Sequence, residues 1–592
     1  MSIYEQLVSK PRKVKPIVIG EKKDGSPIEL DYESQLQFHT HLIGLSGRGK
    51  SRAIEYILRQ FILDRVGFTL IDPHGDIYEA LVCWLTRQRE GFLSDRKIHL
   101  FDPAHPRWRF GYNPLRIPDG TPIAVREAIA MDRVEAVMEA VSQVMGGENT
   151  EQMPLYQRTF STILYTLATH GLTIFEAMRL LPASEEAFRE YLARDLPDEV
   201  ARLAWLEMHS WKLKDYSQNV ASLYNRLHRM MRHPFVRQIL AQTKNTLDVR
   251  KVMDDGDIVL ANFQPRPGFP DANADLLARL LLCDYTQTAR SRPANQSRPH
   301  FLVIDECYRY LTSDIERILD QTRKYGLHLM LAHQRLSQLG KPGEPIYEGV
   351  MEGAQNKLIF GTSYQSALEL ADRFFSHEYD LERPKHSMDR SVQVGVTRTI
   401  MHGKTRTNTE GDTWSEGVSS MVNAVTAHGY RFDADGNQFG SYSEAQAYGV
   451  GEGTSVARGG VSTFSEGVSE QESFEPVYRI LPTQLHDLSE ERHLKAVEIA
   501  KLGQQSLIVR AADLQRYDGQ TVTYQRSVPS FEAVQACYEK LFELDPFNTE
   551  IALVEEELRE RRASLGALMS EVGSRNAPEP EEPDEHKDVE WR

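Results

Sequence analysis

Residues 44–51 read Gly-Leu-Ser-Gly-Arg-Gly-Lys-Ser, the G-x-x-x-x-G-K-S spacing of a phosphate-binding (Walker A) loop. An apolar run at 39–43 enters this loop, and a helical pattern at 52–63 leaves it. Glycines let backbone N–H groups curl around an anion, and the helix that follows points the positive end of its dipole at the same place. The sequence therefore requires a strand, a tight loop and a helix in succession, which predicts a nucleoside triphosphate site.

Two side chains of this loop have specific chemistry. The Lys50 ammonium can reach the β and γ phosphates, which makes it a candidate catalytic group, and the Ser51 hydroxyl can ligate Mg²⁺. We therefore predict ATP and Mg²⁺ as cofactors. The predicted nucleotide-binding residues are Gly44, Ser46, Gly47, Arg48, Gly49, Lys50, Ser51 and Arg52.

A second motif, Phe-Leu-Val-Ile-Asp-Glu at 301–306, has the form of a Walker B strand. Four apolar residues suit a strand buried on both faces, and the acids then emerge at its carboxyl end, beside the phosphate loop. Asp305 is expected to hold the Mg²⁺ hydration shell, and Glu306 to polarise the attacking water as a base or by orienting it. Many strands end in acids, so this prediction depends on the loop at 44–51.

A third block at 319–335 predicts a helix, a glycine cap, an apolar strand and a polar tip. Its last part places Gln334 at the end of a strand adjacent to the strand that carries Asp305. A carboxamide there can hydrogen-bond the γ-phosphate or the attacking water and sense whether ATP is intact. The alternative is that Gln334 merely begins a loop.

Asp72-Pro-His-Gly-Asp76 follows another buried-strand pattern and is expected near the nucleotide. We interpret His74 as a positioning residue or a contact to a neighbouring subunit. Metal ligation by this Asp-x-His-x-Asp pattern is the less favoured alternative, because Ser51 and Asp305 already provide for Mg²⁺.

Strand and helix patterns alternate in the nucleotide-binding region, which predicts an α/β fold with a parallel-rich central sheet. An all-α domain and a long β-rich or low-complexity segment interrupt it. The predicted boundaries are 1–38 (short N-terminal β segment), 39–117 (first part of the core), 118–247 (all-α insertion), 248–387 (core with both catalytic strands), 388–473 (Gly/Ser/Thr-rich insertion), 474–515 (return to the core), 516–575 (C-terminal helical region) and 576–592 (acidic, disordered tail).

The insertion at 388–473 contains a repeat: Thr-Trp-Ser-Glu-Gly-Val-Ser at 413–419 returns as Thr-Phe-Ser-Glu-Gly-Val-Ser at 463–469. Asp435-Gly436 is a hairpin-turn signal near its middle. One interpretation is a flexible low-complexity segment, and the other is a long β-ribbon; partial order is favoured.

The distribution of charge indicates how the protein could bind nucleic acid. The net charge is −16, which does not suit a protein that grips nucleic acid with its whole surface but allows a local basic channel. Arg226, Arg229, His233 and Arg237 would share one helical face, although Pro234 limits that helix. Ordinary salt bridging is the favoured alternative for these residues.

The four cysteines show no C-x-x-C spacing, which argues against zinc and iron–sulfur sites. No apolar run approaches the roughly 18 residues that span a bilayer, and the first residues lack a signal-peptide core. We therefore expect a cytoplasmic protein.

Taken together and in order, these motifs resemble the HerA/FtsK superfamily of DNA-pumping ATPases, and in particular the cytoplasmic part of TraD/TraG-type conjugative coupling proteins. The motifs that carry the resemblance are residues 44–51, 72–76, 112–115, 247–260, 301–306 and 323–334. The resemblance implies a RecA-like P-loop NTPase core and a homo-oligomeric ring, usually a hexamer, with ATP at each subunit junction and DNA in the central hole.

The resemblance also assigns two residues. Arg323 matches the arginine that reaches the γ-phosphate of the neighbouring subunit, and Gln334 matches the sensor glutamine. The alternative for Arg323 is a solvated cation at a helix end, where it favours the helix dipole.

Two departures from the family bear on the function. Coupling proteins normally begin with transmembrane helices, and HerA proteins with a β-barrel, and we expect neither here. A DNA translocase that works with a separate effector, such as a nuclease or a sirtuin-like protein in anti-phage defence, therefore stands first. A conjugative or type IV secretion coupling ATPase is the second hypothesis. The third, a nucleotide-sensing scaffold that moves no DNA, is disfavoured because only hydrolysis needs Glu306, Arg323 and Gln334 together.

Overall fold

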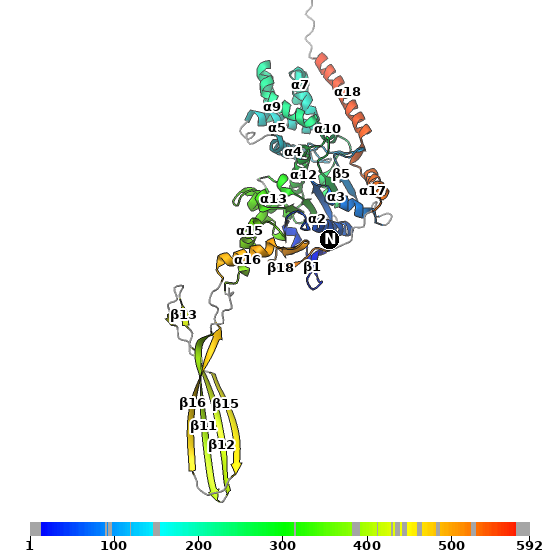
Figure 1. The fold of residues 1–592 in the computed structure, drawn as a ribbon. Coiled ribbons are helices and arrows are strands. Elements are labelled where there is room, and N and C mark those ends of the chain that lie inside the picture. Colours follow the sequence, from blue (N-terminus) through cyan, green and yellow to red (C-terminus); the bar gives the residue numbers. More distant parts are fainter. Residues whose placement is uncertain are drawn as a thin grey trace, which may run out of the picture. The chain divides into compact units, whose positions relative to one another are not determined.

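The computed structural model describes residues 14–88, 92, 97–118, 120–145, 154–312, 315–381, 391–410, 412–427, 430–432, 438–440, 447–458, 465–480, 486–522 and 529–575. The chain forms two compact units (Figure 1). Unit 1 consists of residues up to Leu370 and from Ala496 onward, and unit 2 consists of Ala371–Lys495.

Unit 1 is built on an eleven-stranded sheet. Across the sheet the strands are β2 (Pro27–Leu30), β1 (Ile17–Lys22), β18 (Arg516–Gln520), β17 (Ser506–Arg510), β10 (Asn356–Phe360), β3 (Thr40–Ile43), β9 (Leu327–His333), β8 (His300–Ile304), β4 (Gly67–Asp72), β7 (Ile258–Asn262) and β5 (Ile98–Phe101). The strands from β10 to β5 run parallel, and those from β17 to β2 are added by antiparallel pairing. This mixed α/β architecture confirms the predicted RecA-like P-loop NTPase fold.

The parallel strands are buried on both faces, because helices cover both sides. On one face, α2 (Lys50–Asp64), α3 (Asp76–Leu85) and α17 (Phe531–Leu544) share an apolar core with the strands. On the other face, the Tyr285 hydroxyl of α12 (Asp271–Arg290) accepts a hydrogen bond from Thr69 of β4 at 2.6 Å. The smaller helices α11 (Val249–Asp255) and α13 (Ile315–Thr322) contact β4 and β9, respectively, and α14 (Pro345–Glu348) packs against α13. The carboxyl ends of the parallel strands are thereby left to form one functional edge.

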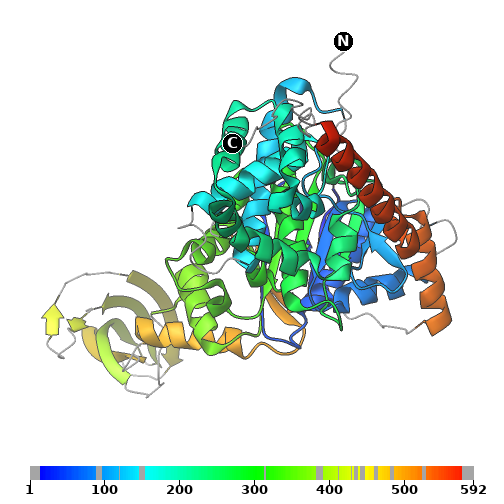
Figure 2. The ribbon, with the colours of Figure 1, turned by 90° about the horizontal axis from the view of Figure 1, so that it is seen from above.

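The described residues of the insertion between β6 (Trp108–Phe110) and α11 form helices joined by loops, with no strand among them. Its helices are α4 (Ile123–Met145), α5 (Pro154–Thr169), α6 (Ala177–Leu180), α7 (Glu186–Arg194), α8 (Glu199–Ser210), α9 (Leu213–Met231) and α10 (Pro234–Leu240). A buried ion pair between Arg133 of α4 and Asp284 of α12 joins it to the core. Figure 2 shows the insertion beside the C-terminal helix α18 (Ile551–Arg575), which packs against α7 and α10.

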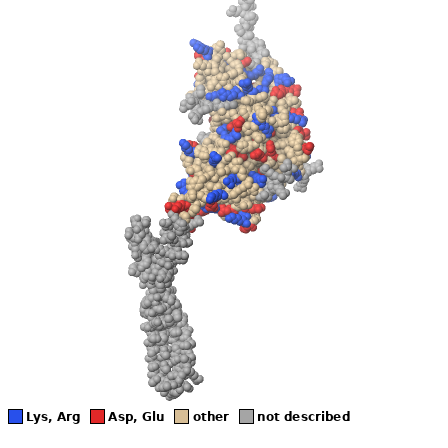
Figure 3. Space-filling model, viewed as in Figure 1, with Lys and Arg blue, Asp and Glu red and all other residues tan. Residues whose placement is uncertain are grey.

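The structure does not form one continuous basic helical face from Arg226 to Arg237. Helix α9 ends at Met231 and α10 begins at Pro234, because proline cannot continue the hydrogen-bonding pattern. Arg226 stacks on the Tyr156 ring at 4.7 Å, so its guanidinium is used inside the insertion. Figure 3 nevertheless shows Lys and Arg side chains gathered in a band across the helical insertion on the face that it views.

Strands from both the N-terminal and the C-terminal region join the main sheet, which corrects two predicted boundaries. Strands β1 and β2 form its edge and therefore do not make a separate N-terminal segment. The C-terminal region 516–575 is not purely helical, because β18 lies between β17 and β1, and β19 (Asn548–Glu550) pairs with β6. This pairing uses the backbone donors and acceptors that a strand edge would otherwise expose.

Unit 2 contains a four-stranded antiparallel sheet in the order β15 (Ala447–Arg458), β12 (Asp412–Ala427), β11 (Ser391–Glu410) and β16 (Ser465–Ile480). The sequence repeat is matched in register, since Gly417 of β12 and Gly467 of β16 both pair with Thr405 of β11. The β-ribbon interpretation therefore describes these strands.

The predicted return to the core at 474 is wrong, because β16 continues in this sheet to Ile480. Helices α15 (Tyr364–Phe375) and α16 (Leu488–Ala500) lead into and out of the unit, and β13 (Tyr430–Phe432) pairs with β14 (Gln438–Gly440). The turn signal at Asp435-Gly436 and the tail at 576–592 lie outside the described residues.

No helix in the described part of the chain is both long and apolar enough to cross a membrane. Cys83, Cys283, Cys307 and Cys537 are all free thiols.

The C-terminal region is anchored to the sheet through a buried histidine, which gives a pH prediction. His99 of β5 contacts Asp545, at the end of α17, at 2.8 Å and Asp257 at 3.4 Å. Burial lowers the pKa of His99, but the two carboxylates outweigh it and raise the pKa to about 9 from 6.5. This raised pKa should contribute about 3 kcal/mol to the stability, present in full below pH 6.5 and lost as pH rises through 9.

The measurement is the urea midpoint of wild type and His99→Gln between pH 6 and pH 9.5. We expect the difference between the two proteins to shrink as pH rises. A difference that does not change with pH would contradict this role of His99.

Candidate functional site

The phosphate loop connects β3 to α2 at the carboxyl edge of the sheet, as the sequence predicts. Its end glycines are required by space and by backbone conformation. A Cβ at Gly44 would lie 2.4 Å from Cβ of Phe360, and Gly49 has a φ of +115° with a built Cβ only 3.1 Å from Cα of Gln505. Larger residues at either position would displace the backbone that surrounds the loop.

A turn from a distant part of the chain supports this loop. The Arg48 carbonyl accepts a hydrogen bond from the Gln505 N–H at 2.9 Å, and the Arg48 guanidinium donates to the Leu502 carbonyl at 3.1 Å. These residues follow α16, and no motif in the sequence marks them as part of the site. The side chain of Arg48 is therefore directed to this supporting turn.

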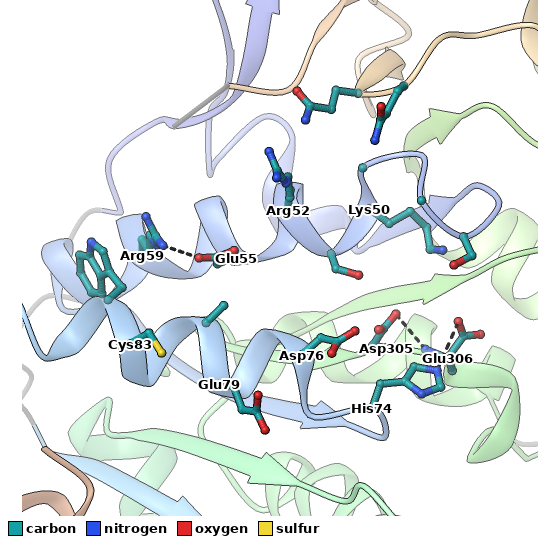
Figure 4. Close-up of a pocket in the computed structure, with 18 of the residues that line it drawn as sticks. Lys50, Arg52, Glu55, Arg59, His74, Asp76, Glu79, Cys83, Asp305 and Glu306 are labelled. Carbon is teal, nitrogen blue, oxygen red and sulfur yellow. Dashed lines mark hydrogen bonds and ion pairs between the residues drawn. The ribbon is translucent and has the colours of Figure 1, made fainter. Parts of the chain in front are cut away.

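A cavity of about 870 Å³ opens in front of the loop, between α2 and α3 (Figure 4). Of the predicted site residues, it is lined by Ser46, Gly47, Gly49, Lys50, Ser51, Arg52, Asp305, Glu306 and Gln334. Gly44 and Arg48 are not among its lining residues, and neither is Arg323. Sequence reasoning missed the far end of the cavity, which is formed by Glu55, Arg59, Trp84, Arg87 and Gln88, and also the contribution of Gln504 and Gln505. The cavity volume is within the range typical of cofactor sites.

Lys50 is buried at the first position of α2, and its ammonium donates a hydrogen bond to the Gly44 carbonyl at 2.7 Å. Burial lowers the pKa of Lys50, and the carboxylates of Asp305 and Glu306 oppose that shift. The ammonium is thus held inside the loop, facing the acids at the end of β8.

Asp305 is 4% exposed at the carboxyl end of β8. Burial raises its pKa to about 7, with further contributions from the negative charges of Asp72 and Glu306, although Lys50 lowers it. A buried carboxylate that lacks full charge compensation is the kind of group that a cation stabilises. Asp305 and the Ser51 hydroxyl line the same cavity, which fits the few oxygen ligands that Mg²⁺ takes from a protein.

Glu306 and Gln334 are brought together across β8 and β9. The Gln334 carboxamide donates a hydrogen bond to Oε1 of Glu306 at 2.7 Å, and Nε2 of His74 lies 4.0 Å from the same oxygen. The second oxygen, Oε2, is buried and has no hydrogen-bond partner among the described residues. Glu306 also has a left-handed backbone, with φ 47°, a strained conformation that is common at functional sites.

Residues in the 72–76 segment have two different roles, since one stabilises a turn and two others line the cavity. Asp72 is fully buried, and its carboxylate accepts hydrogen bonds from the backbone N–H groups of residues 74, 75, 77 and 78. It therefore holds the turn instead of facing a nucleotide, whereas His74 and Asp76 line the cavity. No group of three or more His, Cys, Asp or Glu side chains in the described ranges is arranged to hold a metal ion, so the Asp-x-His-x-Asp metal alternative gains no support.

Arg323 lies at the opposite edge of the sheet from the phosphate loop. It begins the turn Arg323–Tyr325 before β9, whereas Gln334 follows the last residue of that strand. Its guanidinium stacks on the Phe38 ring at 4.7 Å and borders a separate groove that includes Lys15, Glu33 and Lys324. Its role as a trans arginine stays a prediction.

The comparisons with known proteins are consistent with this site. Residues 17–282 match the family model described as the central domain of the helicase HerA. Residues 299–412 match the model described as the TraM recognition site of TraD and TraG. A comparison with curated protein sequences finds no significant match.

Solved structures of similar fold include plasmid coupling protein TrwB in complex with ADPNP, at 13% identity over 88% of this chain and 97% of that chain, with a TM-score of 0.47. They also include TrwB with ADP and Mg²⁺ (13% identity, 90% and 94% coverage, TM-score 0.44). A third is VirB4 of Thermoanaerobacter pseudethanolicus, at 12% identity over 62% of this chain and 89% of that chain, with a TM-score of 0.39.

The two family matches together cover the helicase-type nucleotide core and the segment that carries Asp305, Glu306 and Gln334. The chain resembles the P-loop ATPases of the HerA/FtsK type and, over residues 299–412, the conjugative coupling proteins TraD and TraG.

Proposed function

We propose that this protein is a ring-forming DNA translocase that hydrolyses ATP with Mg²⁺. The observation that carries the proposal is the convergence of Lys50, Ser51, Asp305, Glu306 and Gln334 on one cavity at the carboxyl edge of the sheet. A nucleotide-binding scaffold needs the loop but has no need of a buried glutamate hydrogen-bonded to a glutamine beside it.

Each group has a defined task in this proposal. The loop amides and Lys50 bind and orient the phosphates. Ser51 and Asp305 would hold Mg²⁺, which would neutralise charge on the transferred phosphoryl group. Glu306 orients the attacking water and accepts its proton, and Gln334 fixes the position of the Glu306 carboxylate. The buried and unpartnered Oε2 of Glu306 is the atom available for that water.

Assembly and partners complete the proposal. A hexamer with DNA in its central hole and a separate effector, such as a nuclease or a sirtuin-like protein in anti-phage defence, are predictions that rest on the family resemblance. A cytoplasmic location is a prediction that rests on the apolar pattern of the sequence. The basic band over the helical insertion supports contact with an acidic polymer (Figure 3).

The test is ATP turnover with and without duplex DNA, on a sample whose mass in solution has been measured. We expect DNA to stimulate turnover at low salt. DNA affinity should fall roughly 10³-fold between about 50 and about 200 mM salt if about six phosphates are contacted. A protein that binds ATP but turns it over at one unchanged rate with or without DNA would be a scaffold or a different motor.

A conjugative or type IV secretion coupling ATPase is the second candidate, favoured by the match of residues 299–412 to the TraM recognition site model. It shares the ATPase chemistry but differs in what activates it. Stimulation by DNA alone supports the translocase, whereas stimulation only when a secretion-channel protein is also present supports the coupling ATPase.

A further inference from the structure

We propose that His333 and His41 form a pair of positioning residues that holds Gln334 in place and ties it to the phosphate loop. His333 is the last residue of β9, directly before Gln334, and His41 lies on β3, which leads into the loop. The inference rests on the proposed ATP hydrolysis, since it assigns the residues that position one of its groups.

The two imidazoles meet inside the protein. Both side chains are fully buried, and the two Nε2 atoms lie 2.6 Å apart. The ring planes are nearly parallel, 7° apart, with centroids 4.8 Å from each other. On its other side, His333 Nδ1 lies 2.9 Å from the Arg335 carbonyl, on the residue that follows Gln334.

These contacts define the tautomer of each ring. A carbonyl oxygen only accepts hydrogen bonds, so His333 must carry its proton on Nδ1. Its Nε2 is then an acceptor, and His41 must donate from its own Nε2. This leaves His41 Nδ1 without a proton, and that atom is buried with no hydrogen-bond partner in the described part of the chain.

The surroundings favour neutral rings. Burial lowers the pKa of both histidines, and Lys357, which pairs with His41 in the register of β10 and β3, lowers them further. The Lys357 ammonium donates hydrogen bonds to the Val350 and Met351 carbonyls. The pair therefore has one fixed direction of hydrogen bonding, from His41 through His333 to the Arg335 carbonyl.

This direction of hydrogen bonding matters because His333 contacts both the phosphate loop and the segment that carries Gln334. Its carbonyl accepts a hydrogen bond from the Gly44 N–H, the first amide of the phosphate loop, at 3.3 Å. Its ring holds the backbone on the far side of Gln334, whose carboxamide contacts Glu306. Loss of the ring bond would let the 334–335 backbone shift, and a shift of about 1 Å in a catalytic group costs on the order of 10²-fold in rate.

The test compares three variants in wild-type and Gln334→Ala backgrounds. His333→Phe keeps the ring shape and removes both hydrogen bonds, and it is expected to lower kcat about 10- to 100-fold with nucleotide affinity unchanged. His333→Asn can still donate to the Arg335 carbonyl, so it should retain most of the turnover. His41→Phe removes only the outer bond and should have an intermediate effect.

The double-mutant cycle separates positioning from general damage. If His333 acts through Gln334, His333→Phe should cause no further loss when Gln334 is already Ala. An equal loss in both backgrounds, a loss confined to nucleotide affinity, or wild-type turnover in His333→Phe would overturn the proposal.

The histidine pair can also be tested by a measurement that does not depend on ATP hydrolysis. Imidazole ¹⁵N spectra of the wild-type protein, assigned with the His41 and His333 variants, report the tautomers directly. We expect Nε2–H on His41 and Nδ1–H on His333. The opposite tautomers, or a protonated ring near neutral pH, would overturn the pair even if the protein hydrolyses ATP, and the expected tautomers would support it even if DNA proves not to be the substrate.

Discussion

Replacement of Glu306 by Gln is expected to lower ATP turnover by roughly 10²–10⁴-fold and to leave nucleotide binding intact. The amide has the same size as the carboxyl group and can still bond Gln334, which now contacts Oε1 at 2.7 Å. It cannot, however, accept a proton from the attacking water. Single-turnover hydrolysis and binding of a fluorescent ATP analogue measure the two steps separately.

The matched control is Glu79→Gln, because Glu79 lines the same cavity from α3 but lies away from the catalytic strands. It removes one negative charge from the cavity, as the Glu306 variant does. Turnover should stay near that of the wild type in this control. If the two variants lose activity equally, the effect comes from the charge of the cavity, and Glu306 is not the group that activates water.

Replacement of Arg323 by Ala is expected to lower turnover by about 10³–10⁵-fold if its guanidinium completes the site of an adjacent subunit. It cannot complete the site of its own chain. β9 separates it from Gln334, and the seven residues of this strand span about 23 Å at 3.3 Å per residue. Lys324→Ala is the matched control, since that ammonium is on the next residue and lies over the Tyr325 ring at 5.0 Å.

A mixing experiment decides where Arg323 acts. Glu306→Gln subunits keep the arginine, and Arg323→Ala subunits keep the glutamate, so each is inactive alone for a different reason. In mixed assemblies, the site of an Arg323→Ala subunit still has its glutamate and can receive the arginine of a neighbouring Glu306→Gln subunit. ATP turnover should therefore return. No recovery in assemblies shown to be mixed would leave Arg323 as a structural cation stacked on Phe38.

The sequence predicted those parts of the site that depend on local spacing. The phosphate loop, the acids after β8 and the glutamine after β9 lie where their patterns place them, because a strand–loop–helix motif carries its own geometry. Gln334 was placed correctly next to the Asp305 strand, since β9 pairs with both β8 and β3.

Other parts depend on contacts between distant segments, which spacing does not encode. Asp72 was expected near the nucleotide, yet its carboxylate is used by four backbone amides of the following turn. The pairing of β18 with β1 joins residues about 500 positions apart, so the short first segment gave no sign of its place in the sheet. The end of the insertion was misplaced because the acidic, polar sequence of β16 carries no strand boundary at residue 474.

The support that Leu502 and Gln505 give to the phosphate loop has a consequence for biosynthesis. Every motif of the nucleotide site lies before residue 336, but the wall behind Gly49 is made by residues about 450 positions further along the chain. At 5–20 residues per second, a ribosome needs roughly 20–90 s to translate that distance. During that interval the nascent protein carries a complete Walker A sequence whose pocket still lacks one side.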